Sequence, residues 1–151
     1  MKLLTTATAL CLGLACATAV ANEPTEKDAV AMAERGAAFF KAHGKEELMK
    51  AISAKNPDFS QGSLYIDMRD VKTGIVLAHP HNPSIVGKDL TDVPDANGKK
   101  YRREIIELAA AKGKGWVDYM YKNPVSGKIE PKTTYILKVD DFVLEAGLYK
   151  K

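Results

Sequence analysis

Cysteine is almost missing from this 151-residue sequence, and its two copies, Cys11 and Cys16, both lie near the N-terminus. From residue 22 onward the chain can therefore form no disulfide bond, and it has neither a thiolate nucleophile nor a cysteine ligand for a metal ion. The sequence also lacks an excess of charge of one sign, because 22 Lys and Arg residues are balanced by 19 Asp and Glu residues. Such a weak and evenly interleaved charge argues against a nucleic-acid-binding protein.

Long hydrophobic runs are missing as well, apart from one at the N-terminus. Lys2 precedes an uncharged stretch over residues 3–20, and Ala19-Val20-Ala21 has the form of a signal-peptidase site. We therefore expect residues 1–21 to be a secretory signal peptide that is cleaved; the alternative is that this stretch is kept as a membrane anchor. Residues 22–151 are then predicted to be one soluble periplasmic domain, and nothing in them suggests a cofactor.

The first part of this domain has the pattern of one long amphipathic helix over residues 23–55. Pro24 and Thr25 are typical of a helix start, and Asn56-Pro57-Asp58 of a helix end. Apolar residues recur along one stripe of this helix at spacings of three, four and eight positions: Val30, Ala33, Ala37, Phe40, Leu48 and Ile52. Such a stripe packs on a sheet or on another helix.

After residue 61 the pattern changes to short strands. Strands are predicted over residues 62–68, 75–79, 115–121, 133–139 and 142–149, and a second helix over residues 99–112. The long connection over residues 80–98 is rich in Pro, Gly, Asp and Asn, and long connections are often functional. This order predicts an α+β fold, in which the long N-terminal helix packs on a five-stranded antiparallel sheet within residues 62–150.

Short motifs lie at the joints between these elements. They are GIVLAHP at 74–80, NPSIVGKDL at 82–90, DANGKKY at 95–101, GKGWVDY at 113–119, NPVSGK at 123–128, PKTTY at 131–135, and Gly147-Leu148-Tyr149. In their order and spacing they resemble the single Cache domain, type 2, over about residues 65–149. The resemblance implies a PAS-like sheet domain that senses ligands outside the cytoplasm. It also implies small carboxylates such as acetate, propionate, pyruvate or lactate as ligands.

Members of that family are mostly the outer parts of chemoreceptors and histidine kinases, which makes such a membrane protein a candidate partner. This sequence ends directly after the last predicted strand, so we expect a stand-alone periplasmic binding module. An alternative is an accessory protein with a vestigial pocket. Its N-terminal helix would then pair with a receptor helix, or with a second copy of the chain in a homodimer.

A site for a carboxylate needs a cation or several donors, together with aromatic walls that exclude water. His79 at a strand end, Tyr101 at a helix start and Lys132 at the start of the fourth strand are candidates for such a site. Two further candidates, Trp116 and Tyr119, would point to opposite faces of a regular strand. The family resemblance favours Tyr119 for the pocket, with Trp116 in its wall or in the core.

Arg102 and Arg103 compete for the role of cation, and Arg103 completes the predicted ligand-binding set of His79, Tyr101, Trp116, Tyr119 and Lys132. None of these positions suggests catalysis, because no nucleophile elbow or acid/base pair emerges. His79 and His81 make only a weak metal site without a third ligand nearby. A calcium loop over residues 93–104 fails because Val93 stands where an Asp is required. A non-catalytic protein without a metal is therefore expected.

Overall fold

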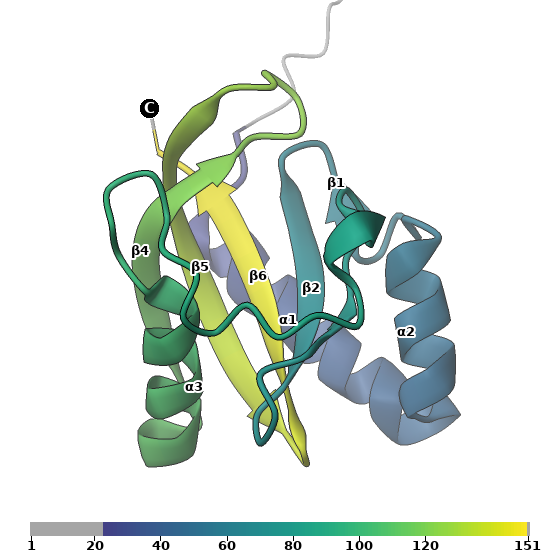
Figure 1. The fold of residues 1–151 in the computed structure, drawn as a ribbon. Coiled ribbons are helices and arrows are strands. Elements are labelled where there is room, and N and C mark those ends of the chain that lie inside the picture. The colour runs from purple at the N-terminus through teal and green to yellow at the C-terminus, as the bar shows by residue number, and fades with distance from the viewer. Residues whose placement is uncertain (1–22, 151) are drawn as a thin grey trace, which may run out of the picture.

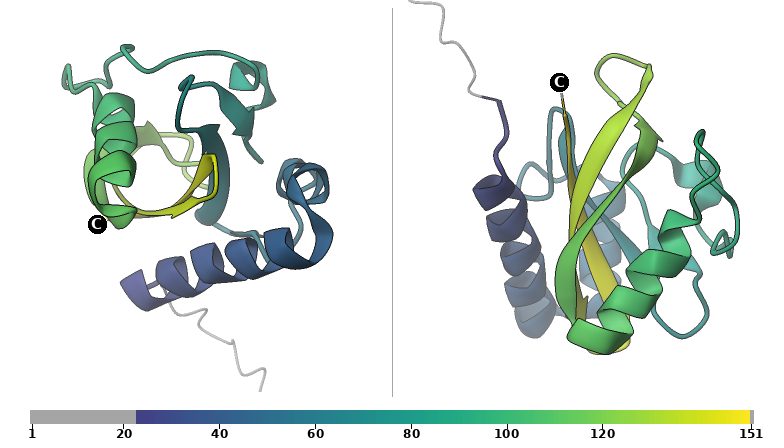
Figure 2. Two further views of the ribbon diagram at one scale, coloured as in Figure 1. Left: turned by 90° about the horizontal axis from the view of Figure 1, so that it is seen from below. Right: turned by 90° about the vertical axis from the view of Figure 1, so that its left-hand side faces the viewer.

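The computed structural model describes residues 23–150, and the predicted signal peptide over residues 1–21 lies outside them. The domain has three layers (Figures 1 and 2). Helix α1 (Glu26–His43) covers one face of an antiparallel sheet, while helix α3 (Tyr101–Lys112) and the connection over residues 79–100 cover the opposite face. Within residues 23–150, no helix is long and apolar enough to cross a bilayer.

The sheet confirms the predicted α+β class. Its strands are β1 (Ser60–Gln61), β2 (Leu64–Asp70), β3 (Val76–Ala78), β4 (Lys114–Lys122), β5 (Ile129–Val139) and β6 (Phe142–Tyr149). Their order is β1-β2-β6-β5-β4, and β3 pairs with the second half of β2. The sequence predicts five strands, and the sixth among the described residues is β1. Its two residues are too few for any periodic pattern to show.

The predicted long helix over residues 23–55 is in fact two helices. Helix α1 starts with a capping box, in which the Thr25 side chain accepts from the Asp28 backbone and Asp28 accepts from Thr25. It ends at Gly44, whose φ of 85° and ψ of 172° are accessible to glycine but strained for other residues. Helix α2 (Lys45–Ser53) starts in a new direction and packs beside β2 and β3. The apolar stripe continues across the break, which hides the break from a periodicity analysis.

Strand alternation divides the side chains of the sheet between two environments. On the face that packs on α1 the residues are apolar, including Leu64, Ile66, Met68, Leu144 and Ala146. On the opposite face, β2, β5 and β6 place buried charged side chains next to one another. These are Asp67, Arg69, Lys132 and Glu145. Burying charge is unfavourable unless it is paired or functional, so this face is the candidate for a site.

Candidate functional site

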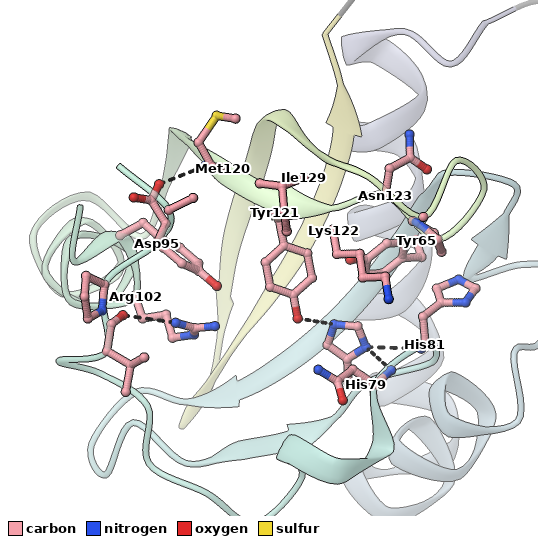
Figure 3. A pocket seen from close by; sticks show the side chains of 17 residues that line it. Tyr65, His79, His81, Asp95, Arg102, Met120, Tyr121, Lys122, Asn123 and Ile129 are labelled. Atoms are coloured by element: carbon pink, nitrogen blue, oxygen red, sulfur yellow. Dashed lines mark hydrogen bonds between the residues drawn. The ribbon is translucent and has the colours of Figure 1, made fainter. Parts of the chain in front are cut away.

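A cavity of about 670 Å³ lies between the connection over residues 79–100, the start of α3 and the β4–β5 hairpin (Figure 3). Its lining includes Tyr65, His79, Arg102, Tyr121 and Ile129. A second cavity of about 10 Å³, room for one water molecule, shares His79, Arg102 and Tyr121 with it and reaches the buried charges of the sheet. The larger cavity is therefore separated from the polar face of the sheet by side chains that line both cavities.

His79 follows β3 and donates one hydrogen bond into this site. Its Nδ1 accepts the backbone N–H groups of His81, at 3.1 Å, and Asn82, at 3.0 Å, so its ring proton must sit on Nε2. Nε2 lies 3.4 Å from the Tyr121 hydroxyl (Figure 3). Burial, reinforced by the charge of Lys132, lowers the pKa of His79 to about 3. The imidazole is therefore a neutral donor with a fixed tautomer at physiological pH.

Arg102 supplies a cation to the cavity from the first turn of α3. Its side chain is 7% exposed, its Nη1 donates to the Val93 carbonyl at 3.2 Å, and its guanidinium lies 4.3 Å from the centre of the Tyr101 ring. Its Nε is buried without a hydrogen-bond partner. Within residues 23–150, no carboxylate forms an ion pair with Arg102. The N-terminus of α3 adds partial positive charge at the same place.

Tyrosine rings form the wall between the cavity and the sheet. Tyr101 stacks on Tyr119 with ring centroids 3.8 Å apart and planes 6° from parallel. The Tyr119 hydroxyl accepts a hydrogen bond from Thr134 at 2.9 Å, so this ring is fixed from both sides. Tyr121, two residues further along β4, packs edge-on against both rings and lines the main cavity. The wall is therefore rigid, and it is apolar except at its hydroxyl groups.

Lys132 lies one layer behind this wall. Its side chain is 1% exposed, and its ammonium is 3.9 Å from the centre of the Tyr65 ring and 5.3 Å from that of Tyr121. Among the described residues it has cation–π contacts but no hydrogen bond or ion pair. Burial lowers the pKa of Lys132 to about 8, although Asp67 and Glu145 act in the opposite direction. Its charge is thus close to the cavity and poorly compensated.

Two carboxylates and an arginine complete the buried charges. Asp67 on β2 is the direct cross-strand neighbour of Glu145 on β6, and Arg69 Nε donates to Glu145 at 2.7 Å. Burial raises the pKa of Asp67, and it raises that of Glu145 to about 7 against the opposing effect of Arg69. With Arg102 and Lys132 included, the part of the chain that the structure describes buries three cations and two acids. One positive charge is in excess when all five groups are ionised.

The structure brings four of the six predicted site residues to this face: His79, Tyr101, Tyr119 and Lys132. Only His79 and Tyr101 line the main cavity, while Tyr119 lines the small inner one. Lys132 lines neither, and borders a separate cavity of about 240 Å³ next to the edge of β4. The roles of these residues in binding stay predictions.

The structure places the other two candidates away from this cavity, Trp116 in the core position that the sequence analysis leaves open and Arg103 on the surface. Trp116 points to the opposite face, where it packs 5.3 Å from Tyr135 and borders α1, as strand alternation requires. Arg103 is exposed and forms a two-pronged ion pair with Asp92, at 2.9 and 2.6 Å. The neighbouring Arg102 takes the cavity position, because consecutive residues of a helix point about 100° apart.

Sequence reasoning missed other residues of the site. Tyr121 shares a face with Tyr119, so strand alternation alone could have included it. No sequence pattern predicted that Asp67 and Glu145 belong to the site. They are neighbours only because two strands far apart in the sequence pair with each other. Within residues 23–150, no group of three His, Cys, Asp or Glu side chains could hold a metal ion.

An antiparallel sheet with a long helix on one face and a ligand-sized cavity on the other defines an α+β domain with room for a small molecule. The sequence model of the single Cache domain 2 family matches residues 29–149. This chain belongs to that family.

Solved sensor domains share the fold. A periplasmic sensor domain of a chemotaxis protein has a TM-score of 0.65 and 26% identity, with 83% of this chain and 90% of that chain covered. A methyl-accepting chemotaxis protein from Vibrio parahaemolyticus has a TM-score of 0.71 and 25% identity, covering 82% and 87%. A third structure, described as the structural basis for carboxylic acid recognition by a Cache chemosensory domain, has a TM-score of 0.64 and 21% identity, covering 83% and 88%. At that identity the third likeness shows the fold alone.

A curated relative is the methyl-accepting chemotaxis protein McpP of Pseudomonas putida. It is 29% identical over 76 residues, which cover 49% of this chain and 14% of the receptor. The chain therefore spans about one seventh of that receptor's length. Its likeness is to a sensor domain of chemotaxis receptors.

Proposed function

We propose that this domain binds one small monocarboxylate, of the acetate, propionate, pyruvate or lactate class, in the 670 Å³ cavity. It acts there as a non-catalytic sensing module. The observation that carries the proposal is the buried guanidinium of Arg102, whose Nε has no partner. An unpaired buried donor on a cation is strongly unfavourable, and a carboxylate satisfies it with a charge-assisted hydrogen bond.

The surroundings of Arg102 favour a single negative charge. The buried groups carry one positive charge in excess when all are ionised, which one carboxylate neutralises and a dicarboxylate would exceed. The Nε2–H of His79, whose contact with the Tyr121 hydroxyl is long at 3.4 Å, and the O–H of Tyr121 add neutral donors in the same cavity. Hydrogen bonds from several directions orient the carboxylate, while the tyrosine wall keeps water away and strengthens them.

The comparisons support the biological setting of this proposal. Relatives of similar fold are periplasmic sensor domains of chemotaxis proteins, and one Cache domain is described as recognising carboxylic acids. We therefore propose a periplasmic location and a chemoreceptor or histidine kinase as the partner. Ligand binding would shift the domain between two conformations that the partner distinguishes.

A thermal-shift screen of acetate, propionate, pyruvate and lactate tests the proposal on the purified domain. A ligand at 100 times its Kd stabilises the folded state by about 2.7 kcal/mol, which is easily measured. Isothermal titration calorimetry of the best acid should give a stoichiometry of one per chain. If no acid shifts the transition and the chain is dimeric by light scattering, a vestigial pocket and helix-mediated association explain the domain better.

A further inference from the structure

The cavity is larger and less polar than a two-carbon acid requires. Its volume of about 670 Å³ lies in the range of pockets that enclose drug-sized ligands. Arg102 and His79 occupy a small part of its lining. An acetate held by these two residues would leave most of the cavity to water.

The lining contains apolar side chains beside polar ones such as Asp95 and Lys122. Val93 and Ile129 line the cavity and are 47% and 53% exposed. Met120 lines it as well. Only four large hydrophobic residues are exposed within residues 23–150, and two of the four line this one cavity. Exposed apolar residues that cluster around a cavity indicate contact with an apolar group.

Apolar and polar residues of the cavity lining lie at opposite ends of the Tyr121 side chain. In Figure 3, Ile129 and Met120 lie at the backbone end of the Tyr121 side chain, and His79 lies at its hydroxyl end. The Val93 carbonyl accepts from Arg102 at 3.2 Å, so the apolar wall starts directly beside the cation. A ligand with its carboxylate at Arg102 would extend its other end along this wall.

The carboxylate of Asp95 would repel a second negative charge at the outer end of the cavity. Its carboxylate lines the cavity and accepts backbone hydrogen bonds from Asn97, Lys99 and Met120, the last at 2.8 Å. These bonds lower its pKa and keep it ionised. A dicarboxylic acid of the same length would place its second carboxylate near this charge, where repulsion weakens binding.

We propose that the preferred ligand is an amphiphilic monocarboxylate, with its carboxylate at Arg102 and an uncharged apolar body along Val93, Met120 and Ile129. A medium-chain or aromatic acid has this chemistry. This inference rests on the proposed function and extends its ligand class from small monocarboxylates to longer ones.

Calorimetric titration of straight-chain acids from acetate to octanoate, below their micelle concentrations, tests the inference. We expect affinity to rise by up to about fourfold for each additional buried CH₂ group. Suberate, the dicarboxylate of the same length as octanoate, should bind at least tenfold more weakly than octanoate. An affinity maximum at acetate or propionate, or equal binding of suberate, would overturn the inference while leaving the proposed function intact.

Ile129→Asn should lower octanoate affinity several-fold more than it lowers acetate affinity. Val125→Asn is the matched control, because Val125 is 70% exposed in the same hairpin and does not line the cavity. Both positions are exposed, so both variants should fold. Octanoate binding that is insensitive to Ile129→Asn contradicts the apolar wall, whereas failure of every acid to bind the unaltered protein contradicts the proposed function itself.

Discussion

Lys132 occupies the space beside Gly147 that a side chain at residue 147 would need. A Cβ on Gly147 would overlap Lys132 Cε and would come within 2.5 Å of Thr134 Oγ1. Since β6 lies between β5 and β2, the absent side chain lets the ammonium cross β6 and reach the Tyr65 ring on β2. A glycine in the middle of a strand thus positions a buried charge.

Gly147→Ala should therefore destabilise the domain by about 1–3 kcal/mol, because it overfills a packed layer. Urea denaturation measures this change. The same substitution in a Lys132→Ala background should cost clearly less, since the overlapping Cε is gone. Equal costs in both backgrounds would show that Lys132 is not the side chain that Gly147 accommodates.

Arg102→Met should weaken carboxylate binding by about 10- to 150-fold, the loss expected for charge-assisted hydrogen bonds. Arg103→Met is the matched control, because it changes the same residue type one position further along the same helix. Arg103 is exposed and paired with Asp92, so its removal should leave affinity within about twofold. Calorimetry on both variants decides which arginine binds the anion, and a larger loss for Arg103→Met would reverse the assignment.

His79→Asn should weaken binding and leave stability nearly unchanged. The Asn Oδ1 can accept the backbone N–H groups of His81 and Asn82 in place of Nδ1, but nothing replaces the Nε2 donor. His79→Ala removes both functions and should also destabilise the domain, by about 1 kcal/mol, because two partly buried N–H groups lose their acceptor. Parallel melts and titrations of the two variants separate the two roles. If His79→Asn binds as well as the unaltered protein, the Nε2–H does not contact the ligand.

Affinity for a carboxylate should fall as pH rises from 6 to 9. Glu145, with its pKa at about 7, gains negative charge over this range, and Lys132, with its pKa at about 8, loses positive charge. Both changes make the site less favourable for an anion. His79 contributes nothing here, because its pKa of about 3 keeps it neutral throughout.

Glu145→Gln isolates the two contributions to this pH dependence. With the acid removed, the decline should be smaller, because of these two groups only Lys132 still titrates, and its midpoint should lie below pH 8, because the charge of Glu145 raises the pKa of Lys132. The measurement is the Kd of one acid at half-unit pH steps. An affinity that is constant over the whole range in the unaltered protein would show that neither buried group acts on the ligand.

The free energy of unfolding should also depend on pH, and Glu145 and His79 should change it in opposite directions. The pKa of Glu145 is higher in the folded state than its ordinary value of 4.5, so the folded state loses stability as pH rises from about 4.5 to 7. The pKa of His79 is lower than its ordinary 6.5, so His79 adds stability as pH rises from about 3 to 6.5. Denaturation of Glu145→Gln should show the rising limb with a smaller opposing decline, since Asp67, whose pKa burial also raises, remains, and an unchanged pH profile would contradict this interpretation.

The sequence by itself determined the class of fold and much of the division between faces. Turn residues located the strands, and the two-residue period placed Tyr119 and Trp116 on opposite sides of β4, as the structure has them. These features are local, because the chain's own geometry fixes the direction of each side chain relative to its neighbours. The ordered motifs located the family for the same reason, since each motif belongs to one turn or strand end.

Tertiary structure alone decided which cation enters the cavity and how large the cavity is. Arg102 and Arg103 are equivalent in sequence, and only the rotation of α3 against the sheet and the connection over residues 79–100 buries one and exposes the other. Likewise, Lys132 is buried because Gly147 lies two strand positions from its cross-strand partner Tyr149. Such contacts join residues far apart in the chain, and their geometry exists only when all the layers have packed together.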